Sequence, residues 1–175
     1  MNAAFDEYFM RTALREAERA AEEGEVPLGC VIVAPAVLEP AHDGRPAVYD
    51  PDPSHARVLA RARNQTEGLA DATAHAEVLS ISAASQAVGG WRLSGARLYV
   101  TKEPCPMCAG AIVLARVDAV VWGVSDPKRG GGTVFGIFGH SGVNHHPEVV
   151  PGVLEGEAKS VLQRFFQARR AGFVV

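Results

Sequence analysis

Apolar residues three and four positions apart predict a helix at the start of the chain. The pattern runs through Phe5, Phe9, Ala13, Ala17 and Ala20. Acidic residues fill the intervening positions, and Gly24 supplies an end signal. One side of this helix is therefore expected to cover another element of the fold.

Two short runs further along predict a β-hairpin. Residues 26–34 (VPLGCVIVA) are apolar and β-branched, and residues 56–63 (ARVLARAR) alternate apolar with basic side chains. The connection between them, Pro35 to Pro53, holds five prolines and several acidic residues. It is far longer than the about 2 to 5 residues of a hairpin turn, and its prolines cannot donate in a central strand. We expect an elaborated surface loop at 35–53.

Strands and helices alternate through the rest of the chain. Asp71 or Thr73 could cap a helix that ends at Gly89 and Gly90. The expected elements are a helix at 74–88, a strand at 96–101, a helix at 104–116, a strand at 117–124, a glycine-rich loop at 129–142, a short strand at 146–150 and a closing helix at 157–171. This alternation predicts an α/β fold with helices on both faces of the sheet.

Composition narrows the class of protein. The 175 residues fit one domain, 1–175, and 47% hydrophobic with 21% charged residues is typical of a globular chain. No apolar run is long enough for a membrane span, and the acidic N-terminus lacks the features of a targeting peptide, so we expect a cytoplasmic protein. A net charge of −3 argues against indiscriminate nucleic-acid binding but allows a local basic patch.

The cysteines suggest metal chemistry. Cys105 and Cys108 are three apart, so their sulfurs are neighbours in a helical first turn and can grip one ion. A redox dithiol, half of a structural zinc site and coincidence remain open for this pair alone. Cys30 is the only other cysteine, so the chain has no second cysteine pair and further ligands must include histidine. Among six histidines, His75 is favoured because it also begins a predicted helix.

The spacing of His75 and Glu77 refines the hypothesis. Residues two apart diverge in a helix interior, but in a first turn both can face a site beyond the helix end. Three ligands would leave the fourth tetrahedral position of a zinc ion for water, as in catalytic sites. Two thiolates cancel the double charge of the zinc ion, so the ion would lower the pKa of that water less than it would with three neutral ligands. A base is therefore needed to take the proton, and Glu77 can supply it. Alternatively, Glu77 merely complements the helix dipole.

Two segments match a known signature. His75-Ala-Glu77 and Pro104-Cys105-Pro106-Met107-Cys108 fit the H-x-E and P-C-x-x-C pattern of the zinc-dependent nucleobase deaminases, which the chain thereby resembles. Within them it is most similar to the bacterial tRNA adenosine deaminases. That likeness covers VPLG at 26–29, TAHAE at 73–77, LYVTKEPCPMCAGAI at 98–112, and the tail from GVNH at 142 through FFQARR at 165–170.

The resemblance implies a fold and an activity. It implies a three-layer α/β/α cytidine deaminase-like fold with a central mixed sheet of about five strands. It further implies one Zn²⁺ per subunit, a homodimer, and a tRNA anticodon stem-loop as substrate. Adenosine at the wobble position would become inosine when zinc-bound hydroxide attacks C6 of the flipped-out base, with Glu77 as the proton shuttle.

Further residues match family positions that touch the substrate. Asn64 would bind the target nucleotide, although it also suits a turn that ends a strand. Asp126 and Lys128 would touch flanking nucleotides, although Asp-Pro is also an ordinary turn. In the basic tail, Arg170 suits a phosphate backbone and Phe166 a stacked base, although basic helix ends also complement the dipole. Of Phe165 and Phe166, at least one should be core.

Two departures and two competing functions complete the hypothesis. The acidic loop at 35–53 has no counterpart in the compact family pattern, and Ala72 stands where a proline is common.

A zinc-dependent deaminase of a free base or nucleoside, guanine or cytosine, would not need the basic tail or the 126–132 loop. A silent RNA-binding scaffold would not need Glu77. GGGTVFG lacks the lysine of a phosphate loop, which argues against nucleoside triphosphate binding.

Overall fold

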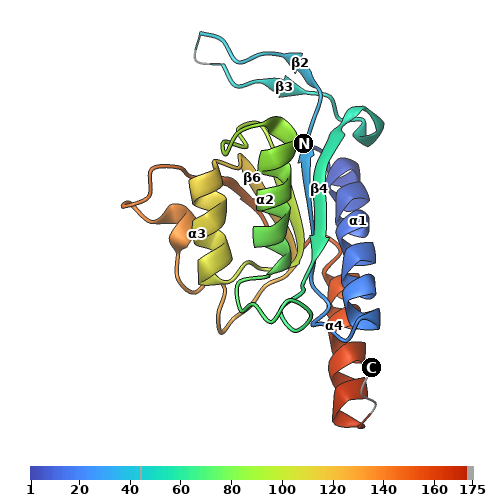
Figure 1. Ribbon diagram of the computed structural model, residues 1–175. Coiled ribbons are helices and arrows are strands. Elements are labelled where there is room, and N and C mark those ends of the chain that lie inside the picture. Colours follow the sequence, from blue (N-terminus) through green and yellow to red (C-terminus); the bar gives the residue numbers. More distant parts are fainter. Residues whose placement is uncertain (44, 173–175) are drawn as a thin grey trace.

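The computed structural model describes residues 1–43 and 45–172 (Figure 1). Four helices and seven strands follow one another along these residues, with short 3₁₀ turns at Pro53–His55 and Ile137–Gly139. The helices are α1 (Ala3–Glu22), α2 (Ala76–Val88), α3 (Pro106–Ala115) and α4 (Glu155–Arg170). The strands are β1 (Gly29–Ala34), β2 (Val37–Glu39), β3 (Val48–Tyr49), β4 (Arg57–Arg63), β5 (Arg97–Lys102), β6 (Ala119–Val124) and β7 (Glu148–Val150).

Five strands form the central sheet, in the order β4-β1-β5-β6-β7. β1 runs antiparallel to both β4 and β5, whereas β5, β6 and β7 are parallel to one another. The predicted hairpin of β1 and β4 is confirmed, with Gly29 opposite Arg63 and Ala34 opposite Arg57. The sheet is therefore mixed, as expected.

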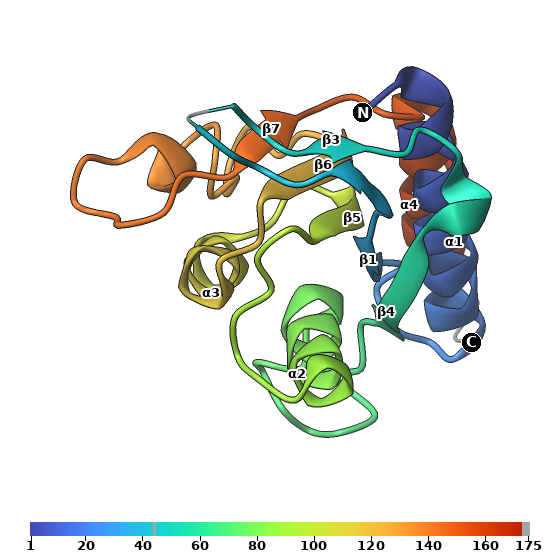
Figure 2. The ribbon, with the colours of Figure 1, turned by 90° about the horizontal axis from the view of Figure 1, so that it is seen from above.

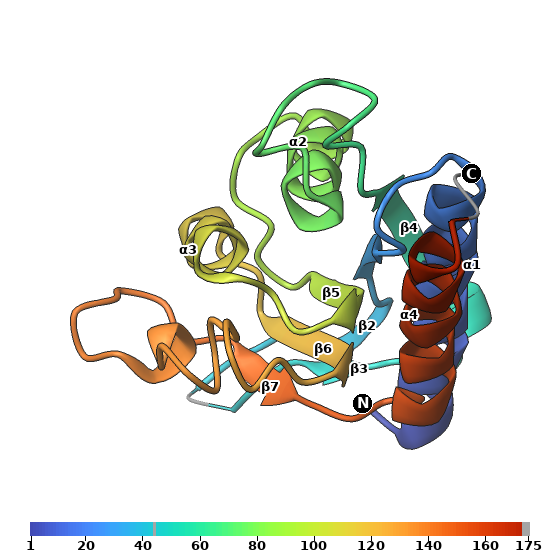
Figure 3. The same ribbon diagram turned by 90° about the horizontal axis from the view of Figure 1, so that it is seen from below.

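Alternate strand residues serve two separate cores. Ile32, Leu98 and Trp122 face α2 and α3, whereas Val33, Tyr99 and Val121 face α1 and α4. Figures 2 and 3 show α2 and α3 on one side of the sheet and α1 and α4 on the other. Because successive side chains of a strand point to opposite faces, apolar strands need cover on both sides, and the helices supply it.

Helix α1 lies directly on β1 at Gly29. A Cβ there would collide with the carbonyl oxygen of Ala13 and would lie 2.6 Å from the amide nitrogen of Ala17. The glycine thus allows the helix backbone to approach the strand more closely than any side chain would permit. The predicted apolar face of α1 is buried, including Phe5, Phe9 and Ala13.

The 35–53 connection projects as a separate two-stranded ribbon, β2 with β3, at the top of Figure 1. It leaves β1 after Ala34, whereas the opposite end of β1, at Gly29, lies beside Thr101 and the end of β5. Cys105 follows the end of β5, so the ribbon and the cysteine pair lie at opposite ends of the sheet. The acidic residues of the ribbon are therefore not neighbours of the cysteine pair.

Some boundaries differ from those predicted. Neither Asp71 nor Thr73 caps α2, so that prediction was wrong; His75 is the N-cap residue and makes no capping hydrogen bond with its side chain. The Asp71 carboxylate instead accepts hydrogen bonds from the backbone and hydroxyl of Thr73 and closes a turn before the helix.

Within the described residues, no helix has the length and hydropathy to cross a bilayer.

Candidate metal centre and active site

Three predicted metal ligands meet between the first turns of α2 and α3. Nδ1 of His75 lies 3.4 Å from Sγ of Cys108 and 3.6 Å from Sγ of Cys105. All three donor atoms lie within 4.8 Å of one another. Cys105 is the N-cap residue of α3, and Cys108 lies in its first turn, so the helical spacing places both sulfurs beside the imidazole. Two sulfurs and one imidazole nitrogen match the donor types that zinc prefers, and a tetrahedral ion would keep one open position.

Hydrogen bonds within this group distribute its protons unevenly. A hydrogen bond from Cys108 lowers the pKa of Cys105 to about 4 against the opposing effect of burial, and a bond from His75 acts in the same direction. The same bond to Cys105, together with burial, raises the pKa of Cys108. The contact with Cys105 also raises the pKa of His75. One thiolate is thus already stabilised, and a divalent cation would displace the remaining protons.

Glu77 lies in the first turn of α2 with only 3% of its surface exposed. Among the residues that the structure describes, its Oε2 is the buried side-chain oxygen or nitrogen that has no hydrogen-bond partner. Burial raises the pKa of this carboxyl group. A buried carboxylate oxygen without a partner is costly, so this oxygen remains available to a group that the protein itself does not supply.

Asn64 directly follows β4 at the same end of the sheet. The next residue, Gln65, donates its backbone N–H to the carbonyl of Ala74, and Ala74 precedes His75. This bond closes the base of the loop, so that Asn64 and His75 are each one residue away from the hydrogen-bonded pair. The Asn64 side chain is buried, and its Nδ2 donates to Glu25 at 2.9 Å and to Thr66 at 3.0 Å.

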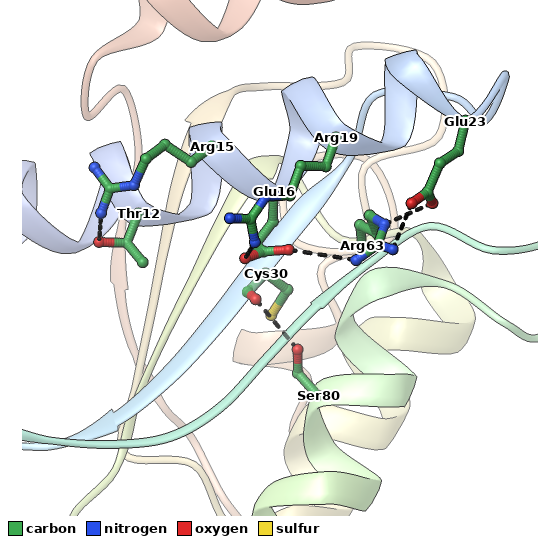
Figure 4. A network of polar contacts seen from close by, with 8 residues as sticks. All are labelled: Thr12, Arg15, Glu16, Arg19, Glu23, Cys30, Arg63 and Ser80. Atoms are coloured by element: carbon green, nitrogen blue, oxygen red, sulfur yellow. Dashed lines mark hydrogen bonds and ion pairs between the residues drawn. The ribbon is translucent and has the colours of Figure 1, made fainter.

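The end of β4 is also tied to α1 (Figure 4). Arg63 donates two parallel hydrogen bonds of 2.6 Å to the Glu23 carboxylate, and Glu16 lies 3.6 Å from the same guanidinium. Bidentate pairs of this kind fix geometry as well as charge. Glu23 and Glu25 thus hold Arg63 and Asn64, two residues in succession.

Asp126 and Lys128 lie in the loop that follows β6. The Asp126 carboxylate contacts Nζ of Lys102 at 2.5 Å and accepts backbone hydrogen bonds from Lys128 and Arg129. Burial works against ionisation of Asp126, but Lys102 and the two backbone N–H groups lower its pKa to about 2. Its carboxylate is therefore engaged within the protein, while Lys128 is exposed.

The two residues on α4 that were predicted to contact RNA lie apart from the three metal donors. Phe166 is 41% exposed and Arg170 is exposed, whereas Phe165 packs in the core at 7%, so the expectation that one of the two phenylalanines is buried is confirmed. α4 covers the face of the sheet opposite α2 and α3 (Figure 3). Its C-terminal end projects past the end of the sheet where α2 and α3 begin (Figure 1).

The sequence reasoning missed two buried carboxylates, Glu25 and Glu103. Glu25 accepts from Asn64, Thr66 and the backbone N–H groups of Glu67 and Gly68. Glu103, two residues before Cys105, likewise accepts several hydrogen bonds. It accepts from the backbone of Asp126, Gly132 and Thr133 and from the Thr133 hydroxyl. Glu25 directly precedes the VPLG segment and Glu103 lies within LYVTKEPCPMCAGAI, but nothing in the sequence distinguishes a buried acid from an exposed one.

The fold and these donors define a class. The family model for the cytidine and deoxycytidylate deaminase zinc-binding region matches residues 3–124. The chain belongs to this family, and within it to the tRNA-specific adenosine deaminases, to which the following relatives are assigned.

The chain is 45% identical to the tRNA-specific adenosine deaminase of Bacillus subtilis over 166 residues, which cover 94% of this chain and 91% of that protein. It is 42% identical to the tRNA-specific adenosine deaminase of Agrobacterium fabrum over 165 residues, 93% of this chain and 95% of the other. A solved structure from a study of A-to-I editing by tRNA:A34 deaminases superimposes with a TM-score of 0.73 at 40% identity, over 89% of this chain and 99% of that one.

A guanine deaminase from Nitrosomonas europaea also superimposes, with a TM-score of 0.70 over 91% of this chain and 83% of that one. Its identity is 19%, so this likeness shows the shared fold alone. The predicted five-stranded mixed sheet with helices on both faces is confirmed as a cytidine deaminase-like fold.

Proposed function

We propose that this protein hydrolyses adenosine to inosine at the wobble position of a tRNA anticodon. The observation that carries the proposal is 45% identity to a tRNA-specific adenosine deaminase over 94% of the chain. The proposal is supported by three candidate donors that lie within 4.8 Å of one another and by the buried Glu77 in the first turn of α2, two residues after His75. A free guanine or cytosine as substrate has weaker support, because the likeness to a guanine deaminase extends only to the fold.

His75, Cys105 and Cys108 would hold one Zn²⁺ per chain. When bound, zinc lowers the pKa of a water molecule and makes it a nucleophile at neutral pH. Glu77 would accept a proton from the attacking water and deliver it to N1 of the adenine as the bond to C6 forms. It would then take the second water proton, from the new C6 hydroxyl, and pass it to the departing amino group, so that water and adenosine give inosine and ammonia.

The remaining predicted residues would bind the RNA. Asn64 would contact the target nucleotide from its place beside His75. Asp126 would act by shaping its loop, because its carboxylate is engaged by Lys102, and this loop would present Lys128 to a phosphate. Phe166 and Arg170 would meet the stem-loop where α4 projects past the end of the sheet. Such a substrate would be met in the cytoplasm.

A homodimer would bury the outer side of α3. This helix is apolar on every side, and Leu114 is 71% exposed at the edge of a hollow of about 350 Å³ that Val113 and Val143 also line. Helices apolar all round are normally covered. A second copy is the partner that the tRNA deaminase assignment favours. We take residues 1–175 as one deaminase domain with the 35–53 ribbon as an addition to it.

The test is deamination of a short anticodon hairpin with adenosine at the wobble position. Inosine should form there, and the same hairpin with the adenosine moved one position along the loop should remain unchanged. Free guanine and cytosine serve as competing substrates in the same assay. Release of ammonia from either base, with the hairpin left intact, would contradict the proposal.

A further inference from the structure

Glu25 contacts both Asn64 and the turn that follows it. The Glu25 side chain is buried, with 3% of the residue exposed, and both oxygens of its carboxylate are engaged. Oε1 accepts from the backbone N–H groups of Glu67 and Gly68 at 2.9 and 2.8 Å. Oε2 accepts from Asn64 Nδ2 at 2.9 Å and from the Thr66 hydroxyl at 3.3 Å. An ionised carboxylate only accepts hydrogen bonds, so every group that faces it must be a donor.

This requirement fixes the orientation of the Asn64 amide. One N–H of Nδ2 goes to Glu25 and the other to the Thr66 hydroxyl, so the nitrogen is fully used. The reversed amide would place Oδ1 against an acceptor and is excluded by repulsion. The side-chain oxygen is therefore the group that remains for a ligand.

We propose that Glu25 is a positioning residue that makes Asn64 a hydrogen-bond acceptor toward the bound nucleotide, so that the group recognised there is an N–H or O–H donor. The inference rests on the proposed function, in which Asn64 contacts the target nucleotide. The carboxylate of Glu25 is occupied by Asn64, Thr66, Glu67 and Gly68, so it would act only through Asn64 and the 64–68 turn.

A swap of the two side chains tests this role. In Glu25→Gln the new amide can keep its oxygen on Glu67 and Gly68 only by turning its NH₂ toward Asn64. Asn64 then reverses and presents its own NH₂ to the substrate. Adding Asn64→Asp restores an acceptor there, because one Asp oxygen accepts from the glutamine and the other faces outward. The double variant keeps the hydrogen bonds and the net charge of the original pair.

Steady-state kinetics on the hairpin substrate should separate these cases. In Glu25→Gln the NH₂ of Asn64 would face the donor group of the substrate, and kcat/KM should fall by roughly 10- to 100-fold. The change should appear mainly in KM, because the hydrogen bond that is lost is one made to the bound substrate. The double variant should return to within about threefold of the unaltered protein, since its hydrogen bonds are restored. Asp6→Asn neutralises a carboxylate of similar burial that pairs with Arg97 and Tyr99 on the α1 face, and should leave KM unchanged.

Three results would overturn the proposal. They are full activity of Glu25→Gln, a double variant no better than the single one, and a double variant that fails to fold. If the unaltered protein ignores the hairpin but deaminates another nucleobase compound, the proposed function fails. The same swap measured on that compound then still decides the role of Glu25.

Discussion

His75 and Cys108 are 33 residues apart in the chain, yet Nδ1 of one lies 3.4 Å from Sγ of the other. Each belongs to the start of a helix on the same face of the sheet, and α2 packs against α3. Helix starts suit this purpose because their backbone N–H groups stabilise thiolates. The three candidate donors are therefore brought together by two helix starts on one sheet.

Replacing Cys108 by Ser should remove the metal. A hydroxyl is a poor ligand for zinc, and the two remaining donors cannot hold the ion well. Metal analysis of the purified protein should show zinc falling from about one per chain to roughly a tenth of that. Cys30→Ser, in the neighbouring strand, should retain zinc, since Cys30 is buried outside the donor group. Equal zinc in the Cys108 variant would refute the assigned ligand set.

Glu77→Gln should separate metal binding from turnover. Glutamine preserves the shape of the side chain but cannot carry a proton between water and base. We expect kcat to fall by about 10²- to 10⁴-fold, the usual contribution of general acid–base catalysis, with the zinc content unchanged. Single-turnover rates on the hairpin, alongside metal analysis, would measure both. Near-normal turnover would show that another group carries the proton.

Asp126 should add stability that disappears in acid. Its pKa in the folded protein is about 2, below the ordinary 3.8. A lowered pKa favours the folded state above the unfolded value, and the benefit is lost as the pH falls through the folded value. Asp126→Asn should therefore cost about 2 kcal/mol at pH 7 and almost nothing well below pH 2, where the carboxyl group is protonated in both the folded and the unfolded state. Urea unfolding at several pH values measures this dependence. Lys102→Gln removes the partner of Asp126, so it should also lower the free energy of unfolding at neutral pH and have little effect in acid.

Gly29→Ala should weaken the contact between α1 and β1. The added Cβ would meet the backbone of α1 at Ala13 and Ala17, which cannot move aside as a side chain can. We expect a loss of roughly 3 kcal/mol in the free energy of unfolding. Gly156→Ala in α4 is the matched control, because no atom lies within 4 Å of its added Cβ and helix propensity should improve stability by about 0.5–1 kcal/mol. Similar values for both variants would contradict the close approach.

Charge reversal should identify the RNA-binding residues. Lys128→Glu and Arg170→Glu should each weaken hairpin binding and reduce the slope of log affinity against log salt by about 1 for each phosphate that is no longer neutralised. Arg57→Glu provides the control, because Arg57 is exposed at the other end of β4, opposite Ala34 and far from the metal donors. Binding at several salt concentrations gives the slopes. Equal effects of all three variants would mean that only the overall charge matters.

Local patterns predicted most of the fold. Helical spacing identified α1, the apolar runs identified β1, β5 and β6, and the glycines after residue 88 identified the end of α2. These predictions succeeded because periodicity and end signals act within a few residues. Capping of α2 was predicted wrongly, since Asp71 and Thr73 bond to each other in a turn instead.

The sequence by itself identified the family and predicted the donor set, because the H-x-E and P-C-x-x-C motifs combine imidazole, carboxylate and thiol groups at fixed spacings. Only the tertiary structure decided that the acidic ribbon lies at the far end of the sheet, that Asp126 is held by Lys102, and that Glu25 faces Asn64. The two hydrogen-bonded pairs join residues 24 and 39 positions apart. The physical reason is burial. A carboxylate holds a particular partner in place when the fold excludes water from it, and the sequence does not show which carboxylates the fold will bury.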